Sequence, residues 1–350
     1  MPLLARTVAT PIAIEVRPGA VESLAPLLKD GRISQGGKVA IVIGPGHGET
    51  IAEGLAASLP AASVHVVAGG TLDAALALIQ GLRGDFYDAV VGIGGGRTVD
   101  AAKYAASMVG LPFVSVATTL THDGLASPVA TLEAGGRKAS FGVHVPIAVV
   151  VDVEQVRSAP IEHVRSGVGD VLSNLSAIAD WELSVREHGG GMDGLAVSLA
   201  RTAGEAIVDL APGTDRFLTT LAEALILSGI AMTVAGTSRP CSGACHEISH
   251  ALDAFHGSPG LHGAQVAFGA RFATWLRGDD ELFGVLDASM RTHHLPRSPA
   301  DLGIDRDTFV DAVVEAPRTR PDRFTVLEHL ALTPEQVGEQ VDAYLETLDR

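Results

Sequence analysis

The feature that most constrains this chain is a change in its hydrophobic pattern near residue 155. Before that point, short apolar runs rich in Val and Ile alternate with amphipathic stretches of helical length. Such runs, ending near Gly, Pro or Asp, are typical of buried parallel strands. They are IAIEV (12–16), VAIVI (39–43), VHVV (64–67), AVVGI (89–93), FVSVA (113–117) and AVVVD (148–152). The alternation predicts βαβ units and a doubly wound, Rossmann-like parallel sheet.

Beyond residue 155 the strand-like runs nearly vanish and helical periodicity takes over. The stretches with this period are 161–187, 193–209, 215–236, 243–256, 262–276 and 279–291. Thr333 and Pro334 predict the N-cap and first residue of a last helix. Prolines 296, 299, 317 and 321 indicate a looser region before it. We therefore predict an α/β domain over residues 1–157 and an all-helical domain over residues 158–350.

Composition excludes several classes of protein. The 25 Lys and Arg against 41 Asp and Glu give a net charge of −16, which argues against general nucleic-acid binding. The hydrophobic fraction of 47% argues against disorder. No uncharged run of 18 apolar residues and no signal-peptide pattern occur, so neither a membrane span nor secretion is expected. Two cysteines do not make a disulfide framework. We expect a cytoplasmic enzyme with a small-molecule substrate.

A glycine-rich turn follows the fourth apolar run, in GIGGGRTVDAAK (92–103). Gly94, Gly95 and Gly96 leave no Cβ in the way of a ligand, and the N-terminus of the following helix suits a pyrophosphate. The spacing matches neither GxGxxG nor a P-loop, so a tight turn without a ligand stays an alternative. Asp100 and Lys103 are compatible with a solvated i,i+3 pair.

A polar loop follows the next run, in ATTLTHDGLASP (117–128). It carries four hydroxyl side chains and one carboxylate, Asp123, between His122 and Gly124. The hydroxyls belong to Thr118, Thr119, Thr121 and Ser127. Ligands bind at the carboxyl ends of strands in such sheets, so this loop is a candidate binding loop. An ordinary Ser- and Thr-rich loop is the alternative.

The helical half holds a candidate metal site within SRPCSGACHEISHALDAFHGSPGLHGAQVAFG (238–269). His246 and His250 share a helix face, and an antiparallel helix pair would bring His246 and His262 together. Imidazoles suit Zn or Fe(II), and a carboxylate commonly completes the set of ligands. The best carboxylate is Asp170, which lies among small and apolar residues where an unpaired acid is costly. Asp180 and Glu247 are weaker candidates.

Three other interpretations of this segment remain open. Residues 246–250 match the HExxH pattern of zinc proteases, although no peptidase context surrounds them. Cys241, Cys245, His246 and His250 suggest a structural Cys2His2 site, although one helix cannot easily surround an ion tetrahedrally. The histidines are also compatible with helix caps or satisfied core positions.

Taken together, the motifs resemble the iron-containing alcohol dehydrogenase and dehydroquinate synthase-like superfamily, and most of all its sn-glycerol-1-phosphate dehydrogenases. The resemblance rests on GGGRTVDAAK, TTLTHDGLASP, GVGDVLSNLSAIADW, SRPCSGACHEISHALD, LHGAQVAFG and FTVLE (324–328). It implies a dehydroquinate synthase-like fold and an NAD(P)-binding N-terminal domain. It implies metal ligation by Asp170, His246 and His262, and substrate-facing roles for Asp123 and His250. The implied cofactor contacts are Gly94, Gly95, Gly96, Asp100, Thr118, Thr119 and Ser127.

The implied reaction interconverts dihydroxyacetone phosphate and sn-glycerol 1-phosphate, with NAD or NADP and with Zn²⁺, Fe²⁺ or Ni²⁺, in a homo-oligomer. The chain departs from the family at Ala117, Thr121-His122 and Ala264, where Pro, Ser/Asn and Glu are usual. The candidates for binding the substrate phosphate are Arg239, Lys138, Arg137 and His144. Three alternatives stay open: a dehydrogenase for another alcohol or aldehyde, a sugar-phosphate cyclase and a non-catalytic binding module.

Overall fold

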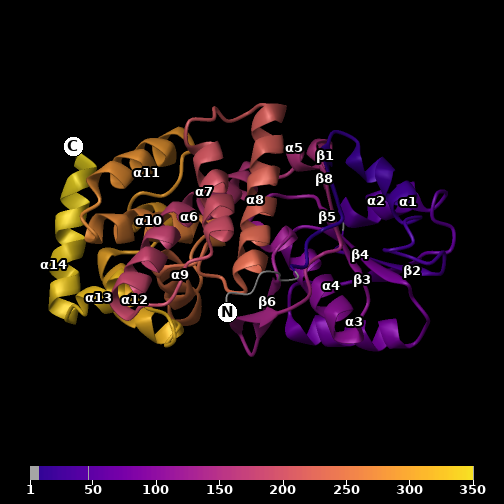
Figure 1. Cartoon of the computed structure of the whole chain (residues 1–350), viewed down its shortest axis with the longest axis horizontal. Helices are drawn as coiled ribbons and strands as arrows, with labels where there is room; N and C mark the ends of the chain where they lie inside the picture. Colours follow the sequence, from indigo (N-terminus) through magenta and orange to yellow (C-terminus); the bar gives the residue numbers. More distant parts are fainter. Residues whose placement is uncertain (1–7, 46, 350) are drawn as a thin grey trace, which may run out of the picture. The chain divides into compact units, whose positions relative to one another are not determined.

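The computed structural model describes residues 8–45 and 47–349, which form two compact units (Figure 1). The first unit runs up to Thr119 and also contains Gly124–Ser158 and Met232–Gly236. The second contains Leu120–Asp123, Ala159–Ala231 and the chain from Thr237 onward. The main division thus falls between Ser158 and Ala159. The hydrophobic pattern does not predict that Leu120–Asp123 belongs to the second unit or that Met232–Gly236 belongs to the first.

The first unit is built on a six-stranded sheet in which all pairings are parallel. Its strand order is β1-β8-β5-β4-β2-β3. The strands are β1 (Ala13–Arg17), β2 (Val39–Ile43), β3 (Ser63–Val66), β4 (Ala89–Gly94), β5 (Phe113–Ala117) and β8 (Ala148–Asp152). All six predicted runs form it. Every residue of β2, β4, β5 and β8 is buried, which explains their unbroken apolar sequences.

Helices cover both faces of the sheet. In β2, Ile41 and Ile43 pack into one core and Ala40 and Val42 into another, because successive side chains of a strand point to opposite faces. The first core is completed by η1 (Ala20–Ser23), α1 (Leu24–Leu27) and α2 (His47–Leu55). The second is completed by α3 (Leu72–Arg83) and α4 (Gly96–Val109). The predicted doubly wound arrangement is confirmed.

One hairpin in this unit is absent from the sequence-based prediction. Strands β6 (Val129–Ala134) and β7 (Arg137–Gly142) pair antiparallel. They are joined by Gly135 and Gly136, whose φ angles are +60° and +77°. Positive φ at both central residues defines the two-residue hairpin turn that Gly-Gly favours. The Gly-Gly pair was therefore the available signal.

The second unit is helical. Its main helices are α6 (Ile161–His188), α7 (Gly194–Val208), α8 (Asp215–Ala235, ending in the first unit), α9 (Ala244–Phe255), α10 (His262–Leu276), α11 (Asp280–Thr292), α12 (Arg306–Thr319) and α14 (Pro334–Leu345). Six of them match the predicted stretches, and Thr333 caps α14 with Pro334 at its start, as predicted. The proline-marked region is not loose throughout, because α12 occupies its centre. Asp305 caps that helix by accepting from the Thr308 N–H, and Pro317 lies in its last turn.

Helix α8 alone among the described helices is long and apolar enough to cross a membrane, with a mean hydropathy of 1.8 over its best window. However, 67% of that window is buried inside the structure. A buried core helix of this length passes the same test, so the pattern is weak evidence for a span.

Candidate active site

The glycine turn lies at the topological switch point of the sheet. Strand β4 pairs with both β2 and β5. The chain leaves β2 for β3 on one side and leaves β4 for β5 on the other. Ligands bind outside the carboxyl ends of the strands at such a point. Gly44 follows β2 there, and Gly94, Gly95 and Gly96 lead from β4 into α4. Gly44 was not singled out from the sequence.

The turn has almost no room for side chains of its own. A Cβ added to Gly44 would lie 2.6 Å from Thr98 Oγ1, and one added to Gly94 would lie 2.9 Å from Thr98 Cβ. The Gly95 N-cap offers no side chain to the first N–H groups of α4. Thr119 Oγ1, 3.1 Å from a Cβ built on Gly95, is buried and has no hydrogen-bond partner in the described chain. These backbone donors and this hydroxyl fit the phosphate oxygens of a nucleotide.

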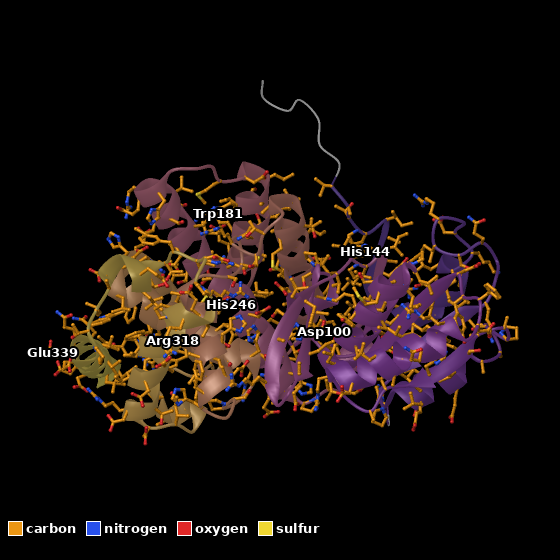
Figure 2. All side chains as sticks on the ribbon, turned by 90° about the horizontal axis from the view of Figure 1, so that it is seen from below. Asp100, His144, Trp181, His246, Arg318 and Glu339 are labelled. Carbon is orange, nitrogen blue, oxygen red and sulfur yellow. The ribbon has the colours of Figure 1, made fainter. Side chains whose placement is uncertain are left out.

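Asp100 and Lys103 are buried, so the interpretation as a solvated pair is wrong (Figure 2 labels Asp100). Lys103 Nζ lies 3.3 Å from Asp100 Oδ1 and donates to the carbonyl oxygens of Gly124 (2.5 Å) and Ser127 (3.2 Å). Asp100 Oδ2 accepts from the Thr131 N–H at 3.2 Å. Lys103 therefore holds the polar loop against α4, and Asp100 holds β6 (Val129–Ala134) there. Thr118 is tied to the glycine turn, because its N–H donates to the Gly94 carbonyl.

Asp170, His246 and His262 converge in the second unit. Asp170 Oδ1 lies 3.9 Å from His246 Nε2 and 3.7 Å from His262 Nε2. The three possible ligand atoms lie within 4.8 Å of one another. The Zn–N bond is about 2.0–2.1 Å long, so a cation between Asp170 and either histidine would reach both with little movement. Asp170 comes from the middle of α6, His246 from α9 and His262 from the start of α10.

Glycines allow these helices to approach closely enough. A Cβ on Gly263 would lie 1.7 Å from the Ser166 carbonyl oxygen, and a Cβ on Gly169 would lie 2.1 Å from the Gly263 carbonyl oxygen. Both glycines are neighbours of a proposed ligand, Asp170 or His262. Ser166 Oγ accepts from the Gly263 N–H and donates to the Thr121 carbonyl. The α6–α10 contact thus fixes the spacing between the carboxylate and the second imidazole.

Hydrogen bonds set the tautomer of His262. Gln265 Nε2 donates to Asp253 Oδ1 (3.2 Å) and the Pro259 carbonyl (3.0 Å), which leaves Gln265 Oε1 as an acceptor. Ser249 Oγ donates to that oxygen at 2.6 Å and therefore accepts from His262 Nδ1 at 3.1 Å. The proton on Nδ1 leaves the Nε2 lone pair available for a metal.

The electrostatics of the group also point to a missing positive charge. Burial, with the nearby Asp123 charge, raises the pKa of Asp170 well above its usual value. Burial, with His262 and His250 close by, lowers the pKa of His246 well below its usual value. A neutral imidazole is the metal-binding form, and a divalent cation would restore the charge of the carboxylate. The donor set therefore fits a metal.

The weaker candidates have structural contacts instead. Asp180 accepts from the Ala244 and Val326 N–H groups and pairs with Arg277 at 2.8 Å. Glu247 is fully buried and accepts from Thr325 Oγ1 at 2.9 Å. Burial and the charge of Glu328 raise the pKa of Glu247 to about 8. A carboxyl so enclosed does not suit the water-activating Glu of a zinc protease.

The two cysteines are also poor ligand candidates. Both are buried, and burial raises the pKa of Cys245 to about 12 and that of Cys241 above its usual value. A thiolate is the form that binds metal, so the Cys2His2 interpretation loses support. Cys245 Sγ instead lies 3.3 Å from His246 Nδ1, where it orients the imidazole.

Comparison with known proteins agrees with this site. Residues 15–160 match the family model described as iron-containing alcohol dehydrogenase. A glycerol-1-phosphate dehydrogenase of Methanothermobacter thermautotrophicus is 34% identical over 336 residues, covering 94% of this chain and 96% of the relative. The Archaeoglobus fulgidus enzyme of the same name is 38% identical over 267 residues, covering 73% and 75%. The chain belongs to the glycerol-1-phosphate dehydrogenase branch of the iron-containing alcohol dehydrogenase superfamily.

Solved structures support the same fold. A probable glycerol dehydrogenase from Sinorhizobium meliloti superimposes with a TM-score of 0.77 over 97% of this chain and 98% of that one, at 21% identity. The match extends over both units. The expected fold of the superfamily is therefore confirmed.

The structure places the two predicted catalytic residues of this family member beside the metal group. The Asp123 N–H donates to Asp170 Oδ2 at 2.8 Å. His250 lies one turn beyond His246 on α9, with 6.4 Å between their ring centroids. Arg320 Nη2 lies 3.0 Å from His250 Nε2. A guanidinium only donates, so Nε2 accepts and a neutral His250 carries its proton on Nδ1.

Two arginines near His250, Arg320 and Arg323, were missed at the sequence level. They lie at the end of α12 and in the loop before α13 (Val326–Leu330). The signal was present in RTRPDRF (318–324), directly before a motif that carries the resemblance. Of the predicted phosphate candidates, Arg239 lies in the same unit as the metal group. Arg137, Lys138 and His144 are exposed on β7 and beyond it in the first unit.

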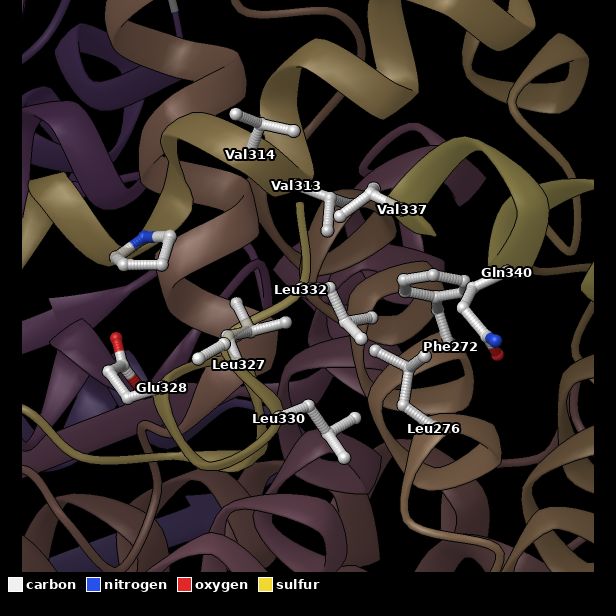
Figure 3. Close-up of a pocket in the computed structure, with 12 residues that line it drawn as sticks. Phe272, Leu276, Val313, Val314, Leu327, Glu328, Leu330, Leu332, Val337 and Gln340 are labelled. Atoms are coloured by element: carbon white, nitrogen blue, oxygen red, sulfur yellow. The ribbon is translucent and has the colours of Figure 1, made fainter. Parts of the chain in front are cut away.

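The second unit also contains an apolar pocket of about 310 Å³ (Figure 3). Its lining is mostly aliphatic and includes Phe272, Leu327 and Val337. None of the residues that line it belongs to the metal group or to the arginines near His250. The pocket is therefore separate from the candidate chemistry.

Proposed function

We propose that this protein is a metal-dependent, NAD(P)-linked oxidoreductase that interconverts dihydroxyacetone phosphate and sn-glycerol 1-phosphate. The main support is the convergence of three possible metal ligands. Asp170 Oδ1 lies 3.9 Å from His246 Nε2 and 3.7 Å from His262 Nε2. Relatives that cover nearly the whole chain bear the name of this activity. We further propose Zn²⁺ as the metal, because two imidazoles and one carboxylate are a typical catalytic zinc set.

The chain would hold the metal through three protein ligands, which leaves a coordination position for a substrate oxygen. A bound Zn²⁺ would polarise the substrate carbonyl as a Lewis acid. The Asp123 N–H occupies Asp170 Oδ2 and so directs Oδ1 toward the histidines. Ser249 and Gln265 keep His262 in the tautomer whose Nε2 carries no proton. These hydrogen bonds therefore orient Asp170 and His262 for metal binding.

The glycine turn would bind the pyrophosphate of NAD or NADP. The donors would be backbone N–H groups at the start of α4 and the Thr119 hydroxyl, which has no hydrogen-bond partner among the described residues. Thr118 and Ser127 lie on the loop that Lys103 and Asp100 anchor, so they belong to the same cofactor site. Asp100 would contribute by pairing with Lys103, which holds this loop. A bound NAD(P)H would supply the hydride for reduction of the ketone.

His250 is our candidate for assisting the proton transfer that accompanies the hydride. Its Nε2 accepts from Arg320, so the neutral imidazole carries its N–H at Nδ1. That N–H can hydrogen-bond the oxygen that becomes the alcohol, and solvent would supply the proton that this oxygen takes up. Asp123, whose N–H donates to Asp170, would also face the substrate.

The test is absorbance at 340 nm with NADH or NADPH and dihydroxyacetone phosphate, after chelation and after Zn²⁺ readdition. We expect oxidation of the cofactor only when metal and substrate are both present. sn-Glycerol 1-phosphate and its 3-phosphate enantiomer, each with the oxidised cofactor, test the stereochemistry. A flat trace from protein that demonstrably binds zinc and cofactor would refute the assignment.

A further inference from the structure

Three arginines form a cationic cluster in the second unit. Arg320 Nη1 and Arg323 Nη2 both donate to Ser238 Oγ, at 3.1 and 2.8 Å. Two guanidinium groups therefore meet at one hydroxyl. Arg323 Nη1 also donates to the Ser242 carbonyl at 2.7 Å. Arg239 is held nearby through Ser184 Oγ and the Asp322 carbonyl.

These guanidinium groups contact neutral acceptors. Within residues 8–45 and 47–349, none of the three has a carboxylate oxygen within the 4.0 Å of an ion pair. Other half-buried arginines of the unit are paired: Arg277 with Asp180 and Arg297 with Asp287, both at 2.8 Å. Like charges brought together without a counterion are costly, and more so away from water. The cluster thus has the charge and geometry to receive an anion.

Burial, together with the charges of Arg320 and Arg239, lowers the pKa of Arg323 to about 10. The group still carries its proton at neutral pH. Arginine forks match the tetrahedral oxygens of a phosphate monoester better than any other side chain.

The arginine cluster also lies close to the metal group. Arg320 is 3.0 Å from His250 Nε2, and the His250 ring centroid is 6.4 Å from that of His246. One imidazole therefore separates the arginines from a proposed metal ligand. In a triose phosphate, three covalent bonds separate the carbonyl carbon from the phosphorus. A substrate whose carbonyl faces the metal group can reach the arginines with its other end.

Building on the proposed function, we propose that Arg320 and Arg323 bind the substrate phosphate and make the site specific for phosphorylated trioses. Ser238 presents the two guanidinium groups side by side, and Arg239 adds a third positive charge. Lys138, Arg137 and His144 then have no necessary role in binding this phosphate.

The test is the selectivity of Arg323→Gln for dihydroxyacetone phosphate over dihydroxyacetone. We expect the ratio of kcat/KM values to fall roughly 100-fold, mainly through a higher KM for the phosphate ester. Arg320→Gln should lower the ratio similarly, and the double variant further. The matched control is Arg318→Gln, because Arg318 is an exposed arginine in the last turn of α12 that lies outside the cluster and pairs with Glu315 at 2.5 Å. Figure 2 labels Arg318. An unchanged ratio in Arg323→Gln, with wild-type zinc content and melting temperature, overturns the proposal.

Inorganic phosphate separates this proposal from the proposed reaction. Calorimetric titration of the zinc-loaded protein should show phosphate binding that Arg323→Gln and Arg320→Gln weaken and Arg318→Gln leaves intact. If the wild type binds phosphate in this way but does not reduce dihydroxyacetone phosphate, the reaction is wrong and the anion site stands. If it reduces the ester and the arginine variants bind phosphate like the wild type, the anion site is wrong and the reaction stands.

Discussion

The two candidate sites of this protein are built in opposite ways. The glycine turn of the first unit is made by leaving side chains out, so that backbone N–H groups face a ligand. The metal group of the second unit is made by bringing side chains from three helices to one point. Glycine serves both, at Gly95 by opening space for a ligand and at Gly263 by letting two helices meet. Replacing a glycine by alanine should therefore weaken ligand binding at the glycine turn but destabilise the fold at the metal group.

The largest effect is expected for Asp170→Asn. The amide keeps the shape of the side chain but removes the negative charge that two imidazoles need to hold a cation. We expect zinc content to fall below a tenth of the wild-type value and kcat to drop by about 1,000-fold or more. Mass spectrometry of bound metal and the 340 nm assay measure the two losses. Asp311→Asn, which changes an exposed acid of α12 outside the metal group, is the control. Normal zinc content in Asp170→Asn would show that the ligand set is wrong.

Gly263→Ala should damage the fold before it damages the chemistry. Its Cβ would lie 1.7 Å from the Ser166 carbonyl, so α6 and α10 must separate. We expect a loss of about 3 kcal/mol or more in the free energy of unfolding, from urea titration. Gly284→Ala in α11 is the control, because nothing lies within 4 Å of its added Cβ. It should stabilise the unit by about 0.5–1 kcal/mol. Equal stability of Gly263→Ala and wild type would contradict the close helix contact.

Gly95→Ala should weaken cofactor binding and spare the metal. Its backbone φ of −79° accepts any residue, and its Cβ would lie 3.1 Å from Thr119 Oγ1, where a nucleotide phosphate is expected. We expect the Kd for NADH to rise about tenfold, measured by fluorescence titration, with zinc content unchanged. Gly54→Ala in α2 adds a methyl group into open space and should leave the Kd alone. Unaltered NADH affinity in Gly95→Ala would move the cofactor away from this turn.

The sequence was most informative where the hydrophobic period is long and uniform. The all-buried strands such as β2 and β4, and helices such as α6 and α10, have one consistent pattern each, so their positions followed from it. The β6–β7 hairpin was missed because its strands are half exposed and their apolar alternation is weak. The sequence does not indicate α12, because a proline such as Pro317 usually breaks a helix, whereas a proline in the last turn removes little of it.

The site divides in the same way. Asp170, His246 and His262 could be selected because each has a chemistry-bearing side chain and a family motif around it. The Ser249–Gln265 hydrogen bond and the arginines near His250 could not be selected from the sequence, because contacts between residues far apart in the chain define them. The spacing of Asp100 and Lys103 is compatible with a solvated pair, but both side chains are buried. Sequence spacing alone does not reveal this burial. A cytoplasmic location and a homo-oligomeric state stay predictions.

The smallest predicted effect tests whether the two units respond separately to acid. His293 in the second unit is buried, stacks on Phe217 and lies 3.2 Å from the Ile207 carbonyl through Nε2. Burial lowers its pKa below the usual 6.5. Below that pH the unfolded chain takes up a proton that the folded chain does not, so stability is lost as pH falls. The slope from this residue is at most about 1.4 kcal/mol per pH unit.

His293→Gln keeps a donor for the Ile207 carbonyl and removes the titration, so its stability should fall less than that of wild type between pH 7 and pH 5. Tryptophan fluorescence during urea unfolding is the measurement, because both tryptophans, Trp181 and Trp275, lie in the second unit. His65→Gln is the matched comparison in the first unit, where burial also lowers the pKa of the histidine. It should leave the tryptophan transition unchanged if the units unfold independently. A shift in that transition would instead show that protonation in the first unit is felt by the metal-binding unit, and the two sites would then share one cooperative fold.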